Sequence, residues 1–278
     1  MRAEKFAADK SPESDLAHIA GALENIRRIQ PEKLVLISTV DVIPPQTGDV
    51  FEDTDCGAMT DSLAPYGRNR LFLELEAQKL CPDALIIRLP GLFGENLKKN
   101  FIYDMINFIP AMLKKPKFDE LRAAAPVLED FYQEKKEEPG FFRLVPDIPG
   151  GDRVVLKAVF EKLGFSALDF TDSRSKFAFY NLKYLYGHIK ILLGNNITLA
   201  HMAAEPVSAA DLHQAIFGRG FINEIINKPF DYTFFKTRHA ALLGGAEADK
   251  SNGYIFDNSR VTAEAAEFAK TKIIKLNN

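Results

Sequence analysis

Cysteine and histidine are sparse in this 278-residue chain. The two cysteines, Cys56 and Cys81, are too few for a disulfide framework or a cysteine-rich zinc site, so both are interpreted as reduced thiols. The five histidines include no close pair at the spacing of metal ligands; they are His18, His188, His201, His213 and His239. The sequence therefore predicts no metal site.

Long apolar runs and an excess of basic charge are also absent. No apolar run approaches the roughly 20 residues that a membrane-spanning helix needs, and the N-terminal stretch MRAEKFAADKSPESD has no apolar segment of the kind that signal peptides carry. We therefore expect a cytoplasmic protein that has no membrane partner. The formal net charge of -3 provides no broad basic field, so we expect no nucleic-acid partner either.

The residues that are present are those of an ordinary globular protein, 46% of them hydrophobic and 26% charged. Two short apolar runs, LVLIS at 34–38 and ALIIRL at 84–89, are typical of strands that are covered on both faces in a parallel sheet. Apolar residues at helical spacing predict an amphipathic helix that begins within SPESD at 11–15, and a second helix is predicted over 66–80. This alternation of helices and strands predicts an α/β fold with a parallel sheet.

The rest of the chain adds further helices and one more strand. The predicted helices cover 100–113, 117–140, 182–193, 208–218 and the C-terminal stretch VTAEAAEFAKTKII, and the strand covers 197–202. The segment 117–140 is interpreted as a charged helical insertion whose charges face solvent. We divide the chain into two lobes, 1–116 and 117–278, and expect 182–218 to return from the second lobe to the sheet.

Polar and aromatic side chains occur where the predicted strands end. Ser38-Thr39 close the first apolar run and Pro90-Gly91 follow the second, so both pairs lie at the carboxyl ends of parallel strands, where open α/β sheets bind ligands. Tyr66 and Arg70 are four residues apart and share one helix face. A cation fixed there would favour the phenolate and lower the pKa of Tyr66, which could then act as a general acid or base while Thr39 holds the same substrate oxygen.

Several of these residues also have a structural interpretation. A Tyr and an Arg at this spacing are often an exposed packing pair, and the Thr39 hydroxyl could cap backbone at the end of a strand. Asp41 fits a loop-capping carboxylate better than an acid catalyst. Gly91 and Gly94 fit a simple turn as well as a close approach of the backbone to a cofactor.

Several motifs together resemble the extended short-chain dehydrogenase/reductase superfamily, most closely its NAD-dependent epimerase/dehydratase branch. They are the hydroxyl after a buried strand, PYGxxR followed by LxLE, and IIRLPGLFG, while FYNLKYLYGHIKILL and AAEPVSAADLHQAIFG resemble the C-terminal lobe of such proteins. The resemblance implies a Rossmann-like sheet flanked by helices and a smaller, mostly helical substrate lobe. It also implies NAD or NADP as cofactor and hydride transfer at a nucleotide-sugar-like substrate.

The resemblance further implies roles for individual residues. Tyr66 would be the catalytic acid/base and Thr39 its hydroxyl partner, while Arg70 occupies the place where the family usually has lysine. The residues then expected to bind the cofactor are Ser38, Tyr66, Arg70, Leu89, Pro90 and Gly91. Apart from the resemblance, we expect Asp41, Lys98, Lys99 and Asn100 to bind substrate, the last three as ligands of a diphosphate, although Lys98 and Lys99 also fit a solvated pair.

The chain departs from the family pattern in three ways. Arg70 keeps the charge of the usual lysine but does not readily release a proton. Residues 1–30 contain no G-x-x-G-x-x-G motif, so we expect the chain to lack the first dinucleotide-binding half and its strands, as a truncated gene product would. Val40-Asp41 replace the Asp-Glu pair of the family's dehydratases, which favours reduction or epimerisation over 4,6-dehydration of a sugar.

Two expectations follow from these departures. LVLIS would lie at the edge of the sheet, and an edge strand invites pairing with another chain, so we expect a homo-oligomer. The second is an alternative to the enzyme: a catalytically inactive member of the family that keeps the fold for a structural or protein-binding role.

Overall fold

The computed structural model describes residues 5–44, 48–55, 62–97, 99–136, 139–245, 248 and 252–277. The chain forms two units that are interleaved along the sequence. The first unit comprises Met1–Gly94, Lys176–Val207 and Asp231–Val261, and the second comprises Glu95–Ser175, Ser208–Phe230 and Thr262–Asn278. This division differs from the predicted lobes at 1–116 and 117–278, because segments that are distant in sequence return to the first unit.

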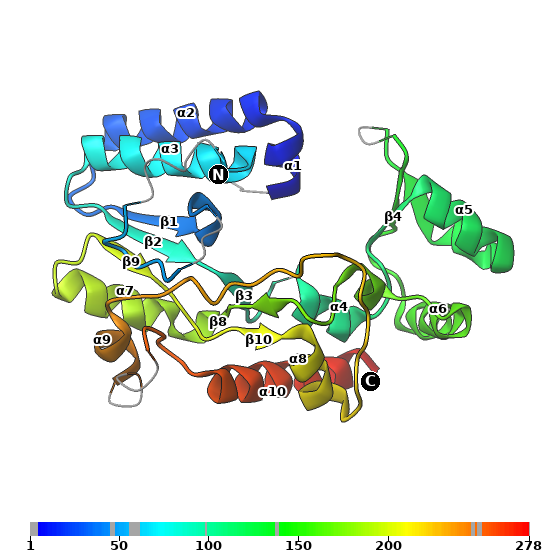
Figure 1. The fold of residues 1–278 in the computed structure, drawn as a ribbon. Helices are drawn as coiled ribbons and strands as arrows, with labels where there is room; N and C mark the ends of the chain where they lie inside the picture. The colour runs from blue at the N-terminus through cyan, green and yellow to red at the C-terminus, as the bar shows by residue number, and fades with distance from the viewer. Residues whose placement is uncertain are drawn as a thin grey trace. The chain divides into compact units, whose positions relative to one another are not determined.

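A three-stranded parallel sheet forms the centre of the first unit (Figure 1). Its strands are β1 (Val35–Thr39), β2 (Leu85–Leu89) and β9 (Leu199–His201), in the order β1-β2-β9. All three pair in parallel, which confirms the predicted α/β fold, and the strand predicted at 197–202 corresponds to β9. Among the described strands β1 has a single neighbour, and its Ile37 side chain is 47% exposed, as the edge prediction requires.

Helices cover both faces of this sheet. Figure 1 shows α2 (Pro12–Ile29) and α3 (Pro65–Leu80) on one face and α7 (Leu185–Gly194) on the other. Of the apolar stripe that the sequence predicts on α2, Ile19 and Leu23 are buried, whereas Leu16 and Ile29 are exposed. The core between α2, α3 and β1 consists of Ile19, Leu23, Leu73 and Ala77, with Leu34 and Leu36 packed against it. Burial of this stripe, rather than helix propensity, supplies most of the stability of such helices.

Shorter elements complete the first unit. They are α1 (Lys5–Lys10), the 3-10 helices η1 (Val40–Val42) and η5 (Leu182–Tyr184), α9 (Ala240–Gly244), and the strands β3 (Gly91–Phe93), β7 (Lys176–Phe177) and β8 (Phe179–Asn181). β3 and β8 pair in parallel. A second apolar cluster surrounds η1 and includes Val40, Val42, Phe235 and Tyr254.

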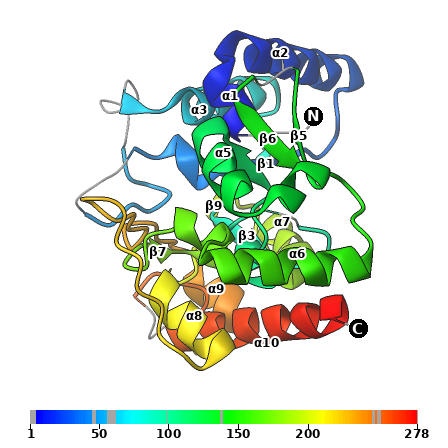
Figure 2. The same cartoon turned by 90° about the vertical axis from the view of Figure 1, so that its right-hand side faces the viewer.

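The second unit is mainly helical and contains a small antiparallel sheet. Its helices are α4 (Phe101–Asn107), α5 (Lys115–Ala124), η3 (Pro126–Asp130), α6 (Gly150–Leu163), η4 (Ala167–Phe170) and α8 (Ala209–Phe217). Its strands are β4 (Met112–Lys114), β5 (Tyr132–Glu134) and β6 (Phe141–Leu144), in the order β4-β6-β5. Figure 2 shows β5 and β6, which pair in the antiparallel direction. The strand β10 (Val207–Ser208) and the helix α10 (Asn258–Asn277) cross the boundaries between the two units.

Several predicted elements of the second unit were wrong. The helix expected over 100–113 ends at Asn107, where Phe108 has a positive φ of 65°, and β4 follows. The helical insertion expected over 117–140 holds two helical segments and then β5, because Tyr132 pairs with Leu144 of β6 and is buried in a common core.

Two helical predictions in the second unit differ in their outcome. α6 was not predicted, although Leu156 and Phe160 stand one turn apart and Gly164, with a φ of 64°, ends the helix. For α8 the predicted start at Ser208 and the stop at Gly218 were both confirmed: the Ser208 hydroxyl accepts from the Asp211 N–H, although the reciprocal half of the predicted capping box is not formed. No helix of the described residues is long and apolar enough to cross a membrane.

Candidate functional site

Thr39 is the last residue of β1, and its side chain caps the 3-10 helix η1 that follows. Its hydroxyl accepts a hydrogen bond from the Asp41 N–H at 3.2 Å and so caps η1, and it also donates to the Asp41 carboxylate at 3.2 Å. The other carboxylate oxygen of Asp41 forms an ion pair with Lys5 of α1. The capping interpretation of Thr39 is therefore confirmed, and its hydroxyl stays half-buried at the carboxyl end of the strand.

The PYG motif brings the first turn of α3 against η1. A Cβ atom built on Gly67 would lie 2.0 Å from the Asp41 carbonyl oxygen, so only glycine permits this approach. Pro65 opens the helix at a position where its missing N–H costs nothing. The Asp9 carboxylate of α1 accepts the free N–H of Tyr66 at 2.8 Å, which fixes the helix start from a neighbouring element.

Arg70 lies inside the protein. Its guanidinium forms an ion pair with Asp15 of α2, and the two side chains are 3% and 9% exposed. Its Cζ atom also lies 5.0 Å from the centroid of the Tyr66 ring, within the range of a cation–π contact. The Tyr66 and Arg70 side chains therefore meet, as their spacing predicts, but Asp15 makes the arrangement a triad.

The pKa of Tyr66 is raised, not lowered as the sequence predicted. Burial of the phenol is the main cause, and the carboxylate of Asp41 adds to it, while the cations Arg70 and Lys5 oppose the shift. The predicted effect of Arg70 is therefore present but is smaller than the cost of placing a phenolate in a poorly solvated site. Tyr66 keeps its proton at neutral pH.

Ser38 belongs to a buried polar row. The register of the sheet places Ser38 opposite Arg88, and Arg88 opposite His201. Glu74 of α3 accepts from the Ser38 hydroxyl and from Arg88, whose Nη2 lies 2.7 Å from Oε2. Arg88 Nη1 lies 3.3 Å from His201 Nε2, so one connected network spans all three strands.

The protonation state of His201 follows from its partners. Its Nδ1 lies 2.7 Å from the carbonyl oxygen of Lys236, which can only accept, so Nδ1 carries the proton and Nε2 accepts from Arg88. Burial lowers the pKa of His201 to about 4, in agreement with a neutral ring. This network fixes the strands beside the candidate site.

The residues after β2 are explained in part by packing. Leu89 and Pro90 are buried, and Gly91 begins β3. A Cβ atom on Gly91 would lie 2.8 Å from the carbonyl oxygen of Ala178, so the close approach of the β8 segment already requires glycine there. A contact of these three residues with a cofactor stays a prediction, and so does the same role for Ser38.

The predicted substrate residues are divided between the units. Asp41 belongs to the first unit, whereas Lys99 and Asn100 belong to the second. The Asn100 side chain caps α4 by accepting from the N–H groups of Ile102 and Tyr103, and its φ is 114°. Lys98 lies outside the described residues. Substrate binding by these four residues therefore stays a prediction.

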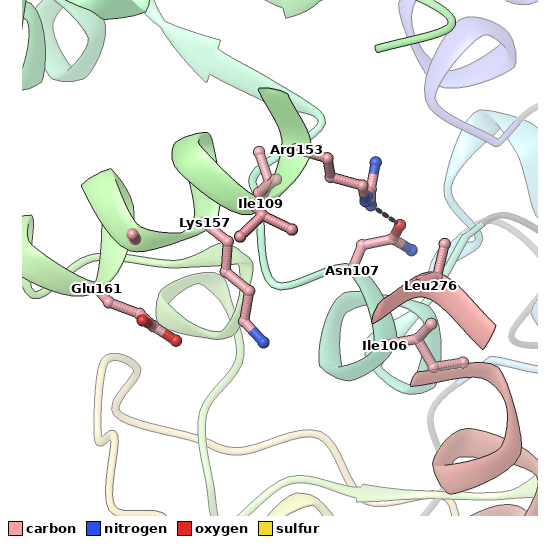
Figure 3. A pocket seen from close by; sticks show the side chains of 9 residues that line it. Ile106, Asn107, Ile109, Arg153, Lys157, Glu161 and Leu276 are labelled. Carbon is pink, nitrogen blue, oxygen red and sulfur yellow. Dashed lines mark hydrogen bonds between the residues drawn. The ribbon is translucent and has the colours of Figure 1, made fainter. Parts of the chain in front are cut away.

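The second unit contains a hollow of about 240 Å³ that the sequence did not indicate (Figure 3). Its lining residues are Ile106, Asn107, Ile109, Arg153, Val154, Lys157, Ala158, Glu161 and Leu276. Figure 3 shows Arg153 of α6 directed at the Asn107 carboxamide of α4, with which it forms a hydrogen bond. Thr39, Tyr66 and Arg70 are not among the lining residues, so the hollow is separate from the candidate site.

Sequence reasoning missed Asp15, Glu74, Arg88 and His201. Two of them carried a signal: Arg88 is a charged residue inside the apolar run ALIIRL, and Glu74 lies one helical turn after Arg70, on the same face. A charge in a buried strand needs a partner, and a carboxylate on the covering helix is the simplest one. Asp15 had no such local signal, since it lies 55 residues before Arg70.

No protein-family model and no curated protein sequence matches the chain. Solved structures do. A UDP-glucuronic acid 4-epimerase from Bacillus cereus, in complex with UDP-glucuronic acid and NAD, has a TM-score of 0.52 at 16% identity over 94% of this chain and 68% of its own. The NAD-dependent NDP-hexosamine 5,6-dehydratase TunA has a TM-score of 0.55 at 13% identity over 98% of this chain and 74% of its own.

A third solved structure is that of an enzyme named for an amino acid and not for a nucleotide sugar. A monomeric L-threonine 3-dehydrogenase has a TM-score of 0.50 at 14% identity over 98% of this chain and 75% of its own. Similarity at these identities shows the fold alone, and it confirms that the sheet and its helices are Rossmann-like. The solved structures that the chain resembles in this way include NAD-dependent epimerases and dehydratases.

Proposed function

We propose that the chain is an NAD(P)-dependent oxidoreductase or epimerase that acts on a nucleotide-sugar-like substrate. The observation that carries the proposal is the half-buried Tyr66 phenol, held beside Asp41 and Arg70 next to the carboxyl end of β1, in a fold shared with enzymes of this kind. The Bacillus cereus epimerase is in complex with UDP-glucuronic acid and NAD, and TunA is an NAD-dependent NDP-hexosamine dehydratase.

Most of the candidate site residues fit the nicotinamide end of the dinucleotide, and Arg70 fits it less well. Thr39 and Tyr66 are half-buried residues that carry hydroxyl groups, and both would hydrogen-bond one substrate oxygen. Leu89, Pro90 and Gly91, at the carboxyl end of β2, would hold the nicotinamide side. Arg70 fits less well, because its guanidinium is enclosed by Asp15 and the Tyr66 ring and acts on a ligand through Tyr66.

The mechanism assigns proton transfer to Tyr66. When bound, the nicotinamide would supply or accept the hydride. The Tyr66 phenol would hydrogen-bond the substrate oxygen and transfer its proton at that atom. The Thr39 hydroxyl, which donates to Asp41 in this structure, would turn to hold the same oxygen, and Asp41 with Lys5 would keep it oriented.

A second candidate is a catalytically inactive protein with a structural or binding role. The observation that favours it is the buried Asp15–Arg70 ion pair together with the raised pKa of Tyr66, since an enzyme that needs a phenolate base gains nothing from either. Binding of a cofactor does not depend on that base. Cofactor binding and turnover must therefore be measured separately.

The test is a titration of the purified chain with NADH and NADPH, followed by nicotinamide fluorescence, and an assay with UDP-sugars. We expect micromolar binding, with turnover that Tyr66→Phe abolishes without weakening the binding. Tyr186→Phe is the matched control, because the Tyr186 side chain is 73% exposed, and it should change neither quantity. Absence of binding would refute the enzyme and favour the second candidate, and unchanged turnover in Tyr66→Phe would remove Tyr66 from the mechanism.

A further inference from the structure

We propose that Asp15 is a positioning residue that holds the Arg70 guanidinium against the ring of Tyr66 and cancels its charge, so that Tyr66 serves as a proton donor and not as a base. The inference rests on the proposed function, whose proton-transfer group it concerns. It assigns a role to a residue of α2 that touches neither cofactor nor substrate in the proposed mechanism.

The Asp15 carboxylate is fully engaged on both oxygens. Oδ1 receives the Arg70 guanidinium, and Oδ2 accepts from the Asn69 side-chain amide at 3.0 Å. The same amide nitrogen also donates to the carbonyl oxygen of Pro12 at 3.1 Å, which anchors it to the start of α2. Asp15 is therefore fixed in one orientation, and Arg70 with it.

Two opposite charges in contact act at a distance as a dipole. An isolated guanidinium 5.0 Å from the Tyr66 ring would stabilise a phenolate strongly in a site this poorly solvated. The Asp15 carboxylate weakens this field at the phenol oxygen, while the charge of Arg70 and its hydrogen bond to Tyr66 still pull the pKa of Tyr66 downward. The direction of the pKa shift of Tyr66, which burial raises against the pull of Arg70, agrees with this geometry.

Other charged groups face Tyr66 from the elements packed around it. α1 contributes Asp9, on the Tyr66 N–H, and Lys5, and η1 contributes Asp41. Tyr232, which packs against the apolar cluster around η1, interacts electrostatically with Asp41 and Lys5. Lys5 and Asp41 pair with each other, as Arg70 and Asp15 do, so each of these two cations has a carboxylate partner. The surroundings of the phenol thus favour its protonated form.

A protonated Tyr66 suits reduction of a carbonyl group. The reduced nicotinamide, when bound, would supply the hydride for the carbonyl carbon. Tyr66 would donate the proton: its O–H bond would break as the new O–H bond forms on the substrate oxygen, and the phenolate left on Tyr66 would take a proton from water. The reverse direction would require the phenolate at the start, which burial disfavours and which Arg70, paired with Asp15, stabilises too little to offset.

The experiment measures the titration of Tyr66 alone, by carbon NMR of the chain labelled at tyrosine Cζ, with Tyr66→Phe to assign the signal. In the unmodified chain the midpoint should lie above the ordinary value of about 10. Asp15→Asn keeps an acceptor for Arg70 but removes the charge, so its midpoint should move to lower pH. Asp15→Glu restores the charge and should return the midpoint toward that of the unmodified chain.

The control is Glu24→Gln, on the exposed face of the same helix, which should leave the Tyr66 midpoint unchanged. A midpoint below about 10 in the unmodified chain overturns the proposal, and this measurement needs no variant to fold. Equal midpoints in folded Asp15→Asn and unmodified protein also overturn it, because Asp15 would then be structural only. Neither titration midpoint depends on cofactor or substrate. Failure of NADH to bind would therefore refute the proposed function, whereas this inference would still be tested by the titration of Tyr66.

Discussion

Gly67→Ala tests whether the close contact between α3 and η1 builds the candidate site. The added Cβ would lie 2.0 Å from the Asp41 carbonyl oxygen, whereas real Cβ atoms are essentially never closer than 3.0 Å to such an atom, so the two backbones must separate by at least about 1 Å. Neither partner is a flexible side chain that could turn away. Overpacking of this kind typically costs about 1–3 kcal/mol, which exceeds the roughly 0.5–1 kcal/mol that alanine gains over glycine within a helix.

The assay is urea unfolding followed by far-UV circular dichroism, since the chain contains no tryptophan to report by fluorescence. Gly21→Ala is the matched control: Gly21 lies in the middle of α2, and a Cβ there would meet no atom within 4 Å. Gly67→Ala should lower the free energy of unfolding, while Gly21→Ala should raise it by about 0.5–1 kcal/mol. If both variants are equally stabilised, the contact between α3 and η1 does not exist as described.

Two further predictions concern the buried polar row. Glu74→Ala leaves the Arg88 guanidinium without its carboxylate, so the free energy of unfolding should fall by about 3–5 kcal/mol. The exposed control Glu24→Ala should lose less than about 1 kcal/mol. Equal losses of the two variants in urea unfolding would contradict the network. Burial holds the pKa of His201 near 4, below its ordinary 6.5, so the unfolded chain takes up the proton first. The contribution of His201 is therefore complete above pH 6.5 and is lost as the pH falls toward about 4. Between about pH 4 and pH 6.5, the free energy of unfolding should therefore depend less on pH in His201→Asn than in the unmodified chain. His18→Gln, at an exposed site, is the control and should keep the pH dependence of the unmodified chain. An unchanged pH dependence in His201→Asn would refute the neutral buried ring.

The elements of the first unit could be predicted because their signals are local. α2, α3, β1 and β2 differ from their predicted ranges only by small shifts at their ends, since each carries either an apolar stripe of helical period or a short apolar run. The antiparallel sheet of the second unit carried no comparable signal. Charged residues surround its strands, and only the burial of Tyr132 and its neighbours in a common core makes them strands.

The candidate site shows the same contrast between local and distant information. The spacing of Tyr66 and Arg70 correctly predicted that the two side chains meet. It could not predict how deeply the phenol is buried or that Asp15 neutralises the guanidinium, because both depend on α2 packing against α3. The predicted sign of the Tyr66 pKa shift was wrong for this reason: the sequence contains the cation but not the solvation.

The inner face of α3 explains why a chain would keep two buried charges so close together. Arg70 and Glu74 follow each other by one turn on this face, and each meets an opposite charge from a different element, Asp15 of α2 and Arg88 of β2. A slip of α3 by one turn would bring the Glu74 carboxylate to Asp15, a like-charge contact in a poorly solvated interior, and would leave Arg88 unpaired. Buried ion pairs add little net stability, but they penalise wrong registers heavily. Since Tyr66 lies one turn before Arg70, the charge pattern that sets the register of α3 also sets the position of the phenol at the end of β1.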